Sequence, residues 1–139
     1  MKKIKGFTLL ELLVVIGIIG VLVALATVAY TATQKSGRNS RRKQDMIAIQ
    51  SALEQYYAAN GFVYPDGNAN CKTATLAYMK SSWPEDPTNK DPYLYTLNPI
   101  CTTTSYCICA LMEGGAGGNS GAGCDFAGAK THYCVQQLQ

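Results

Sequence analysis

The sequence KGFTLLELLVVIGIIGVLVALATVAY, residues 5–30, decides the fold of this chain. Between Phe7 and Tyr30, 19 of the 24 residues are apolar, and Glu11 carries the only charged side chain. A helix of this length spans about 36 Å at a rise of about 1.5 Å per residue, which is enough to cross a bilayer. The stretch therefore predicts a membrane-spanning helix.

The helix is expected to continue beyond Tyr30, because no proline occurs before Pro65. After the apolar stretch, hydrophobic side chains recur at spacings of three and four residues and form one helical stripe: Met46, Ile49, Leu53, and Tyr56 or Tyr57. Asn60-Gly61 is typical of a helix end. We predict one helix from about Phe7 to Ala59, apolar on all sides in its first half and amphipathic in its second.

Loops and strands are expected after the helix. Composition predicts strands at Tyr93–Leu97, Tyr106–Met112 and His132–Leu138, a short helix over Thr73–Lys80, a turn at Asn98-Pro99 and a flexible loop over Gly114–Lys130. No helix long enough for a crossover separates the strands, which favours an antiparallel sheet. The predicted fold class is α+β, with the amphipathic half of the helix packed on a small sheet of about three strands.

All six cysteines lie in the last 69 residues: Cys71, Cys101, Cys107, Cys109, Cys124 and Cys134. An even number in a small, loop-rich region predicts three disulfides formed in an oxidising compartment. Zinc is the competing interpretation, but the chain has no CxxC pair and a single histidine. Cys107 and Cys109 are two residues apart on one strand, so they are not expected to pair with each other, and the pairing otherwise stays open.

The charges are divided along the chain. A basic cluster, Lys35, Arg38, Arg41, Arg42 and Lys43, follows the apolar stretch, and such a run is typical of a solvated helix face or of contacts between subunits. From Gln44 onward the chain has four basic and eight acidic residues, so no nucleic-acid partner is expected. No nucleophile–base pair, phosphate-binding loop or metal-ligand set occurs, so we expect no enzyme activity, no cofactor and no metal.

Three explanations compete for the N-terminus. A secretory signal would be cut near Ala24-Leu25-Ala26, but its apolar core would be unusually long and would contain Glu11. A plain membrane anchor also leaves Glu11 unexplained, since a lone carboxylate near the bilayer centre costs about 2.5–3.5 kcal/mol. The third explanation gives this residue a role.

Lys5-Gly6-Phe7-Thr8-Leu9-Leu10-Glu11 resembles the processing site of type IV prepilins and pseudopilins. The resemblance implies that a prepilin peptidase cuts after Gly6 and that Phe7, the new first residue, is N-methylated. It also makes Glu11 the residue of subunit assembly. Further similarity extends over Gln55–Pro65, Trp83–Pro87 and Asp91–Tyr95.

The resemblance implies a pilin-like fold with three parts. Residues 1–6 would be a cleaved basic leader, residues 7–60 a long helix whose part 7–30 is transmembrane and later forms the filament core, and residues 61–139 a disulfide-bonded head. The protein would enter the cytoplasmic membrane as a single-pass prepilin. An assembly platform would then add it to a homopolymeric, extracellular type IV pilus.

Two alternatives remain. Within the same family, the chain would be a pseudopilin of a periplasmic filament for type II secretion or DNA uptake. However, Gly114–Lys130 offers only Asp125 where such proteins usually have an acidic calcium loop, and six cysteines are unusual there. Many family members also have a proline near the position of Val28, so any kink in this helix would have to come from another position. The alternative of a different class is a small secreted, disulfide-rich binding protein released after Ala26.

Overall fold

The computed structural model describes residues 6–80, 82–97, 101–115 and 117–139. The lysines of the leader and the turn predicted at Asn98-Pro99 lie outside these residues. The chain divides into two compact units, Met1–Lys35 and Ser36–Gln139. The elements in chain order are α1 (Leu9–Ala59), α2 (Asn68–Thr75), η1 (Leu76–Tyr78), β1 (Thr96–Leu97), β2 (Cys107–Leu111), η2 (Glu113–Gly115), η3 (Ala122–Cys124) and β3 (His132–Gln136).

Helix α1 begins at Leu9, two residues later than predicted. Thr8 precedes the helix and bonds to its first turn, so the chain before Leu9 is not helical. The predicted end is confirmed, since Asn60 donates its backbone N–H to the Tyr56 carbonyl at 2.9 Å and Gly61 takes a left-handed φ of 72°. Glycine accepts this conformation without steric cost, which ends the helix.

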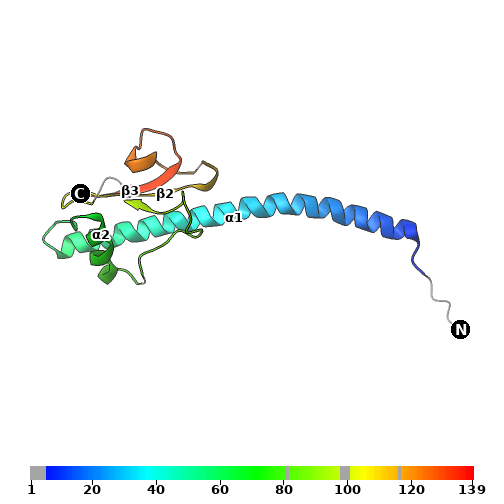
Figure 1. Cartoon of the computed structure of the whole chain (residues 1–139), viewed down its shortest axis with the longest axis horizontal. Helices are drawn as coiled ribbons and strands as arrows, with labels where there is room; N and C mark the ends of the chain where they lie inside the picture. The colour runs from blue at the N-terminus through cyan, green and yellow to red at the C-terminus, as the bar shows by residue number, and fades with distance from the viewer. Residues whose placement is uncertain (1–5, 81, 98–100, 116) are drawn as a thin grey trace. The chain divides into compact units, whose positions relative to one another are not determined.

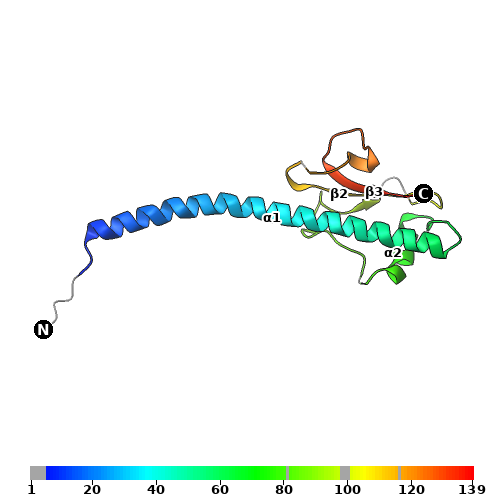
Figure 2. The ribbon, with the colours of Figure 1, turned by 180° about the vertical axis from the view of Figure 1, so that it is seen from behind.

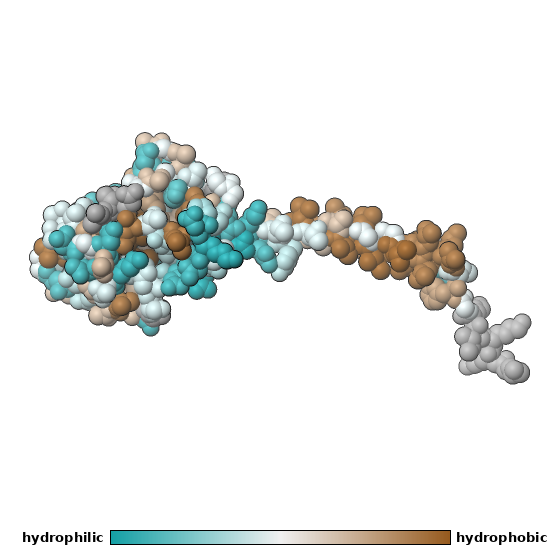
Figure 3. Space-filling view, viewed as in Figure 1, coloured by the Kyte–Doolittle hydropathy of each residue, from teal (hydrophilic) through white to brown (hydrophobic). Residues whose placement is uncertain are grey.

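The first unit is the apolar part of α1. From Gly6 to Gly37 every residue is exposed, including large apolar side chains such as Leu9 (82%) and Val28 (71%). Figure 3 shows this part of the helix covered by hydrophobic residues. Among the described residues, α1 is the one helix long and apolar enough to cross a membrane.

In the second unit, Ser36–Gln139, which we call the head unit, the sheet packs on the amphipathic part of α1. The predicted stripe is confirmed, because Met46, Ile49 and Leu53 are fully buried. In both views β2 and β3 lie along one side of this part of α1, and the segments 76–80 and 82–95 run along the other (Figure 1, Figure 2). The core between them also includes Tyr64, Tyr106, Ile108, Met112 and Val135.

The sheet has the predicted antiparallel topology, in the order β1-β2-β3. Cys109 lies opposite Thr96 on one side and opposite Cys134 on the other. The strands are shorter than predicted, and β1 covers only Thr96–Leu97. The α+β fold with three antiparallel strands on a long helix is thus confirmed.

The short helix was predicted too late in the chain. It covers Asn68–Thr75 rather than Thr73–Lys80, and residues 76–78 continue it as a 3-10 turn. Gly67, with a φ of 84°, provides the left-handed turn from which the helix starts, and its carbonyl accepts the Cys71 N–H at 2.9 Å. The start of α2 is therefore set by the backbone conformation of Gly67. The hydrophobic pattern of the sequence does not reveal this conformation.

The segment 114–130 was expected to be a flexible loop, but its described residues are held by several contacts. Asn119 exchanges two hydrogen bonds with the backbone of Cys134, at 2.8 and 2.9 Å. Ser120 forms an isolated bridge with His132. A side chain at Gly118 would overlap the His132 carbonyl, so the loop backbone lies directly against β3.

Candidate functional site

The predicted processing site lies just before α1. Gly6, Phe7 and Thr8 precede the helix and are exposed, and Phe7 is 84% exposed. No other part of the described chain lies within 4 Å of where a Gly6 side chain would be. A peptidase needs its substrate in a non-helical, accessible form, and this segment meets that requirement.

Thr8 and Glu11 form a reciprocal cap at the start of α1. Oε2 of Glu11 accepts hydrogen bonds from the Thr8 backbone N–H at 2.9 Å and from the Thr8 hydroxyl at 2.8 Å. In return, the Glu11 N–H donates to the Thr8 hydroxyl oxygen at 3.3 Å. This is the capping box, which satisfies two backbone N–H groups that a helix start otherwise leaves unpaired.

A hollow lies on the apolar helix where Gly17 has no side chain. Its volume is about 340 Å³, and it is lined by Val14, Gly17, Ile18, Val21 and Leu22. These residues are spaced by three and four and so share one helix face. The face is exposed and almost entirely apolar.

The structure therefore brings together four features: an exposed glycine, a following phenylalanine, a glutamate in the first helical turn and an exposed apolar helix. The chain carries the Prokaryotic N-terminal methylation motif. The match covers residues 1–27 and is the signature of type IV pilins and pseudopilins. Neither the curated proteins nor the solved structures gave a match.

The methylation motif lies within the first unit. The head unit holds a buried ion-pair cluster that the sequence did not indicate. Arg42 was expected on a solvated helix face or in contacts between subunits, but its side chain is fully buried within the chain. Nε and Nη2 donate to the two carboxylate oxygens of Asp86 at 2.5 and 3.1 Å. Nη1 donates to Glu113 at 2.8 Å, and the guanidinium lies 4.7 Å from the centre of the Tyr93 ring.

Glu113 is shared between two arginines. Arg38 forms a bidentate pair with it, at 2.5 and 2.6 Å, while Arg42 contacts one of the same oxygens. The hydrogen bond from Arg38, aided by Arg42, lowers the pKa of Glu113 to about 2. Burial opposes the charge on Asp86, but hydrogen bonds from Arg42 and Thr88 still hold its pKa below the ordinary value. The cluster thus ties α1 to η2 and to the segment around Asp86.

Glu54 forms a second polar centre on α1. Its carboxylate accepts hydrogen bonds from the hydroxyls of Tyr64, at 3.0 Å, and Tyr106, at 2.8 Å. The Tyr64 ring in turn stacks on Tyr57, with ring centres 4.5 Å apart. Burial, together with the bond to Glu54, raises the pKa of Tyr106 above its ordinary value. These tyrosines act as packing residues of the head.

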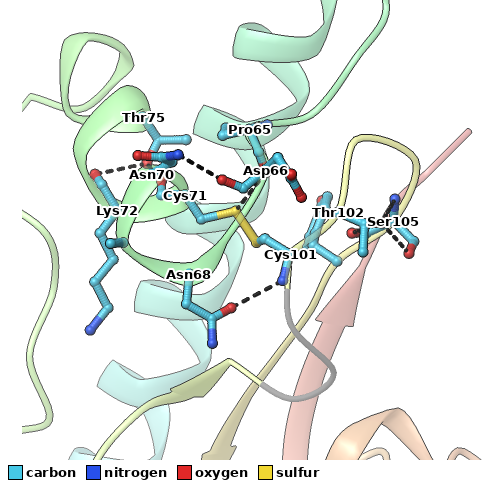
Figure 4. Close-up of a disulfide and its surroundings, with 12 residues drawn as sticks. Pro65, Asp66, Asn68, Asn70, Cys71, Lys72, Thr75, Cys101, Thr102 and Ser105 are labelled. Carbon is cyan, nitrogen blue, oxygen red and sulfur yellow. Dashed lines mark hydrogen bonds between the residues drawn. A yellow bond between two sulfur atoms is a disulfide. The ribbon is translucent and has the colours of Figure 1, made fainter.

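Three disulfides join all six cysteines: Cys71–Cys101, Cys107–Cys124 and Cys109–Cys134. Cys107 and Cys109 are not paired with each other, as expected, although their sulfurs lie 3.7 Å apart. Figure 4 shows how Cys71–Cys101 fastens α2 to the segment before β2, where Asn68 also accepts the Cys101 N–H at 3.0 Å. The other two disulfides fasten η3 and β3 to β2.

Proposed function

We propose that the chain is a structural subunit of a type IV pilus, formed after a prepilin peptidase removes residues 1–6 and Phe7 is N-methylated. The observation that carries the proposal is the start of α1. Gly6 and Phe7 lie outside the helix and are exposed, and Glu11 lies in the first turn, one helical turn after the capping Thr8.

Glu11 can cap its own helix and still bind a cationic group of a neighbouring subunit through its second carboxylate oxygen. Its Oε2 accepts both bonds from Thr8, whereas Oε1 has no hydrogen-bond partner within the described residues of one chain. Cleavage after Gly6 creates an ammonium group on Phe7. Pairing that group with Oε1 of Glu11 in a neighbouring subunit offsets the desolvation of both charges and fixes the axial register of the subunits.

The exposed apolar surface supports a polymer of this chain. In the cytoplasmic membrane lipid covers the segment 7–30, and on extraction by an assembly platform that cover is lost. Burying a side chain such as Leu or Val stabilises by about 1.5–3 kcal/mol, so extraction is feasible only if the same surface is reburied. Packing of these helices against each other in a filament core does so, with the heads of residues 61–139 on the outside.

Two features of the head favour an extracellular pilus over a periplasmic pseudopilus. Its six cysteines, a number unusual among pseudopilins, form three disulfides. The segment 114–130 also lacks the set of acids that an acidic calcium loop needs. The carboxylate of Asp125, the only acid of the segment 114–130, accepts hydrogen bonds from the backbone N–H groups of Ala127 and Gly128 at 3.2 and 3.0 Å. This carboxylate therefore closes its own turn and has no neighbouring acid in the segment with which to form an acidic calcium loop.

The test is Glu11→Gln in the host that makes the filament, with Asp66→Asn, an exposed acid of the head, as the matched control. Glutamine keeps the size of the side chain but removes the charge that would pair with Phe7. We expect Glu11→Gln to be processed normally but to give at least about tenfold less sheared filament, and Asp66→Asn to match the parent. Normal filament yield from Glu11→Gln would contradict the assembly role.

A further inference from the structure

Two hollows on the head meet at Lys72, and the proposed function uses neither. One has a volume of about 250 Å³ and is lined by residues of α2 and of the segment 83–95, including Lys72, Trp83, Glu85 and Tyr95. The second, of about 340 Å³, is lined by Asn68, Ala69, Lys72, Tyr95 and Leu97. Because they share Lys72 and Tyr95, they form one groove, which we name the Lys72 groove. It lies entirely within the head unit.

One wall of the Lys72 groove is aromatic and held in place. Trp83 and Tyr95 are half-buried and pack against the hydrophobic core. The Tyr95 hydroxyl donates to Asp45 on α1 at 2.7 Å, which fixes the ring. Leu94, 46% exposed, extends the apolar surface. A flat, preformed apolar wall of this kind binds a ligand at little cost in side-chain entropy.

The rim of the groove offers hydrogen-bond donors and acceptors together. Lys72 is exposed and takes part in no ion pair among the described residues. Asn68 lies four residues earlier on α2, and Figure 4 shows both side chains pointing to the same side of that helix. Asn89 and Glu85 also line the groove, where the Asn89 amide donates to exposed Glu85 at 3.1 Å and leaves the second Glu85 oxygen as an acceptor.

The charges of the groove do not favour an anion. Asp86 lines it too, but Arg42 neutralises that carboxylate. The remaining charges, Lys72 and Glu85, are opposite and cancel. A ligand that suits this rim presents both hydrogen-bond donors and acceptors and carries no net charge.

We propose that the Lys72 groove binds a neutral saccharide. Its C–H face would lie on Trp83, and its hydroxyl groups, which both donate and accept, would bond to Lys72 and to Glu85. The groove is complete within a single head, so the proposal does not depend on filament assembly. On a surface filament, such a site would recognise glycans.

The single tryptophan of the chain provides the assay, because Trp83 is itself part of the groove. The full-length protein, in a detergent without a sugar headgroup, is titrated with methyl β-glucopyranoside, methyl β-galactopyranoside and N-acetylglucosamine while tryptophan fluorescence is recorded. We expect a saturable change with at least one probe and a Kd of about 1 mM, the affinity of a weak single-sugar site. The absence of a saturable change with all three would overturn the proposal.

Variants at exposed rim residues test the location of the site without disturbing the core. We expect Lys72→Met and Asn89→Gly each to weaken binding at least about fivefold. Glycine is used at position 89 because the backbone there has a positive φ of 45°, which glycine adopts without strain. Arg41→Met, an exposed cation on α1 that lines neither hollow, is expected to leave binding unchanged. Equal binding by the Lys72→Met variant and the parent would contradict the assignment. So would binding of glucuronate alone that is abolished by salt, since this would show a simple anion contact at Lys72.

Discussion

Replacing Arg42 by methionine tests whether the buried ion pairs hold the head together. The Arg42 side chain is fully buried and makes two hydrogen bonds to Asp86, whose side chain is also fully buried, and one to Glu113. Methionine fills part of the space but leaves the Asp86 carboxylate without its cation. Breaking a buried pair in this way typically costs about 3–5 kcal/mol.

That cost is large for a domain of this size. Small domains are stable by about 5–15 kcal/mol, and each 1 kcal/mol shifts the midpoint of thermal unfolding by roughly 4–8 °C. We therefore expect Arg42→Met to lower the midpoint by at least about 10 °C. The assay is thermal unfolding of the full chain in micelles, followed by the fluorescence of Trp83, which packs against the core of the head.

The neighbouring arginine provides the matched control. Arg41 is exposed, so Arg41→Met is expected to shift the midpoint by no more than a few degrees. A double variant, Arg42→Met with Asp86→Asn, removes both charges and is expected to recover part of the loss. Equal unfolding midpoints for Arg42→Met and Arg41→Met would show that the buried ion pairs do not hold the head together.

Two further predictions concern the head. Because the folded pKa of Glu113 is about 2, below its ordinary value of 4.5, its contribution to stability is complete above about pH 4.5 and is lost as the pH falls toward 2. Unfolding midpoints measured across this range should fall less steeply for Glu113→Gln, and an identical slope would contradict the role of the arginines. The Cys71–Cys101 disulfide closes a loop with a sequence separation of 30. Replacing both cysteines by serine is expected to cost about 3–4 kcal/mol in chemical denaturation, and an unchanged free energy of unfolding would contradict that estimate.

The elements with strong periodic patterns could be predicted from the sequence. The spacing of Met46, Ile49 and Leu53 gave the buried stripe of α1. The composition of the segments between turn residues gave the three antiparallel strands. Both predictions rest on local sequence patterns, which do not depend on distant partners.

Structural features that depend on residues far away in the sequence could not be predicted. Arg42 is charged and lies in a basic cluster, and its burial depends on ion pairs with Asp86 and Glu113, 44 and 71 residues away. The disulfide pairing likewise depends on how β2 meets η3 and β3. The cap of α1 is different, because the Thr-x-x-Glu signal at Thr8–Glu11 is local and was present in the sequence. The glutamate was interpreted only as a residue of assembly.

Prepilin processing is tested most directly by mass spectrometry of the N-terminal peptide from protein recovered from its native host. We expect a first residue of Phe7 carrying an N-methyl group. A chain that begins at Thr27 would mean release of a secreted soluble domain, and one that begins at Met1 would mean an uncut anchor. Either result would contradict the role proposed for Glu11.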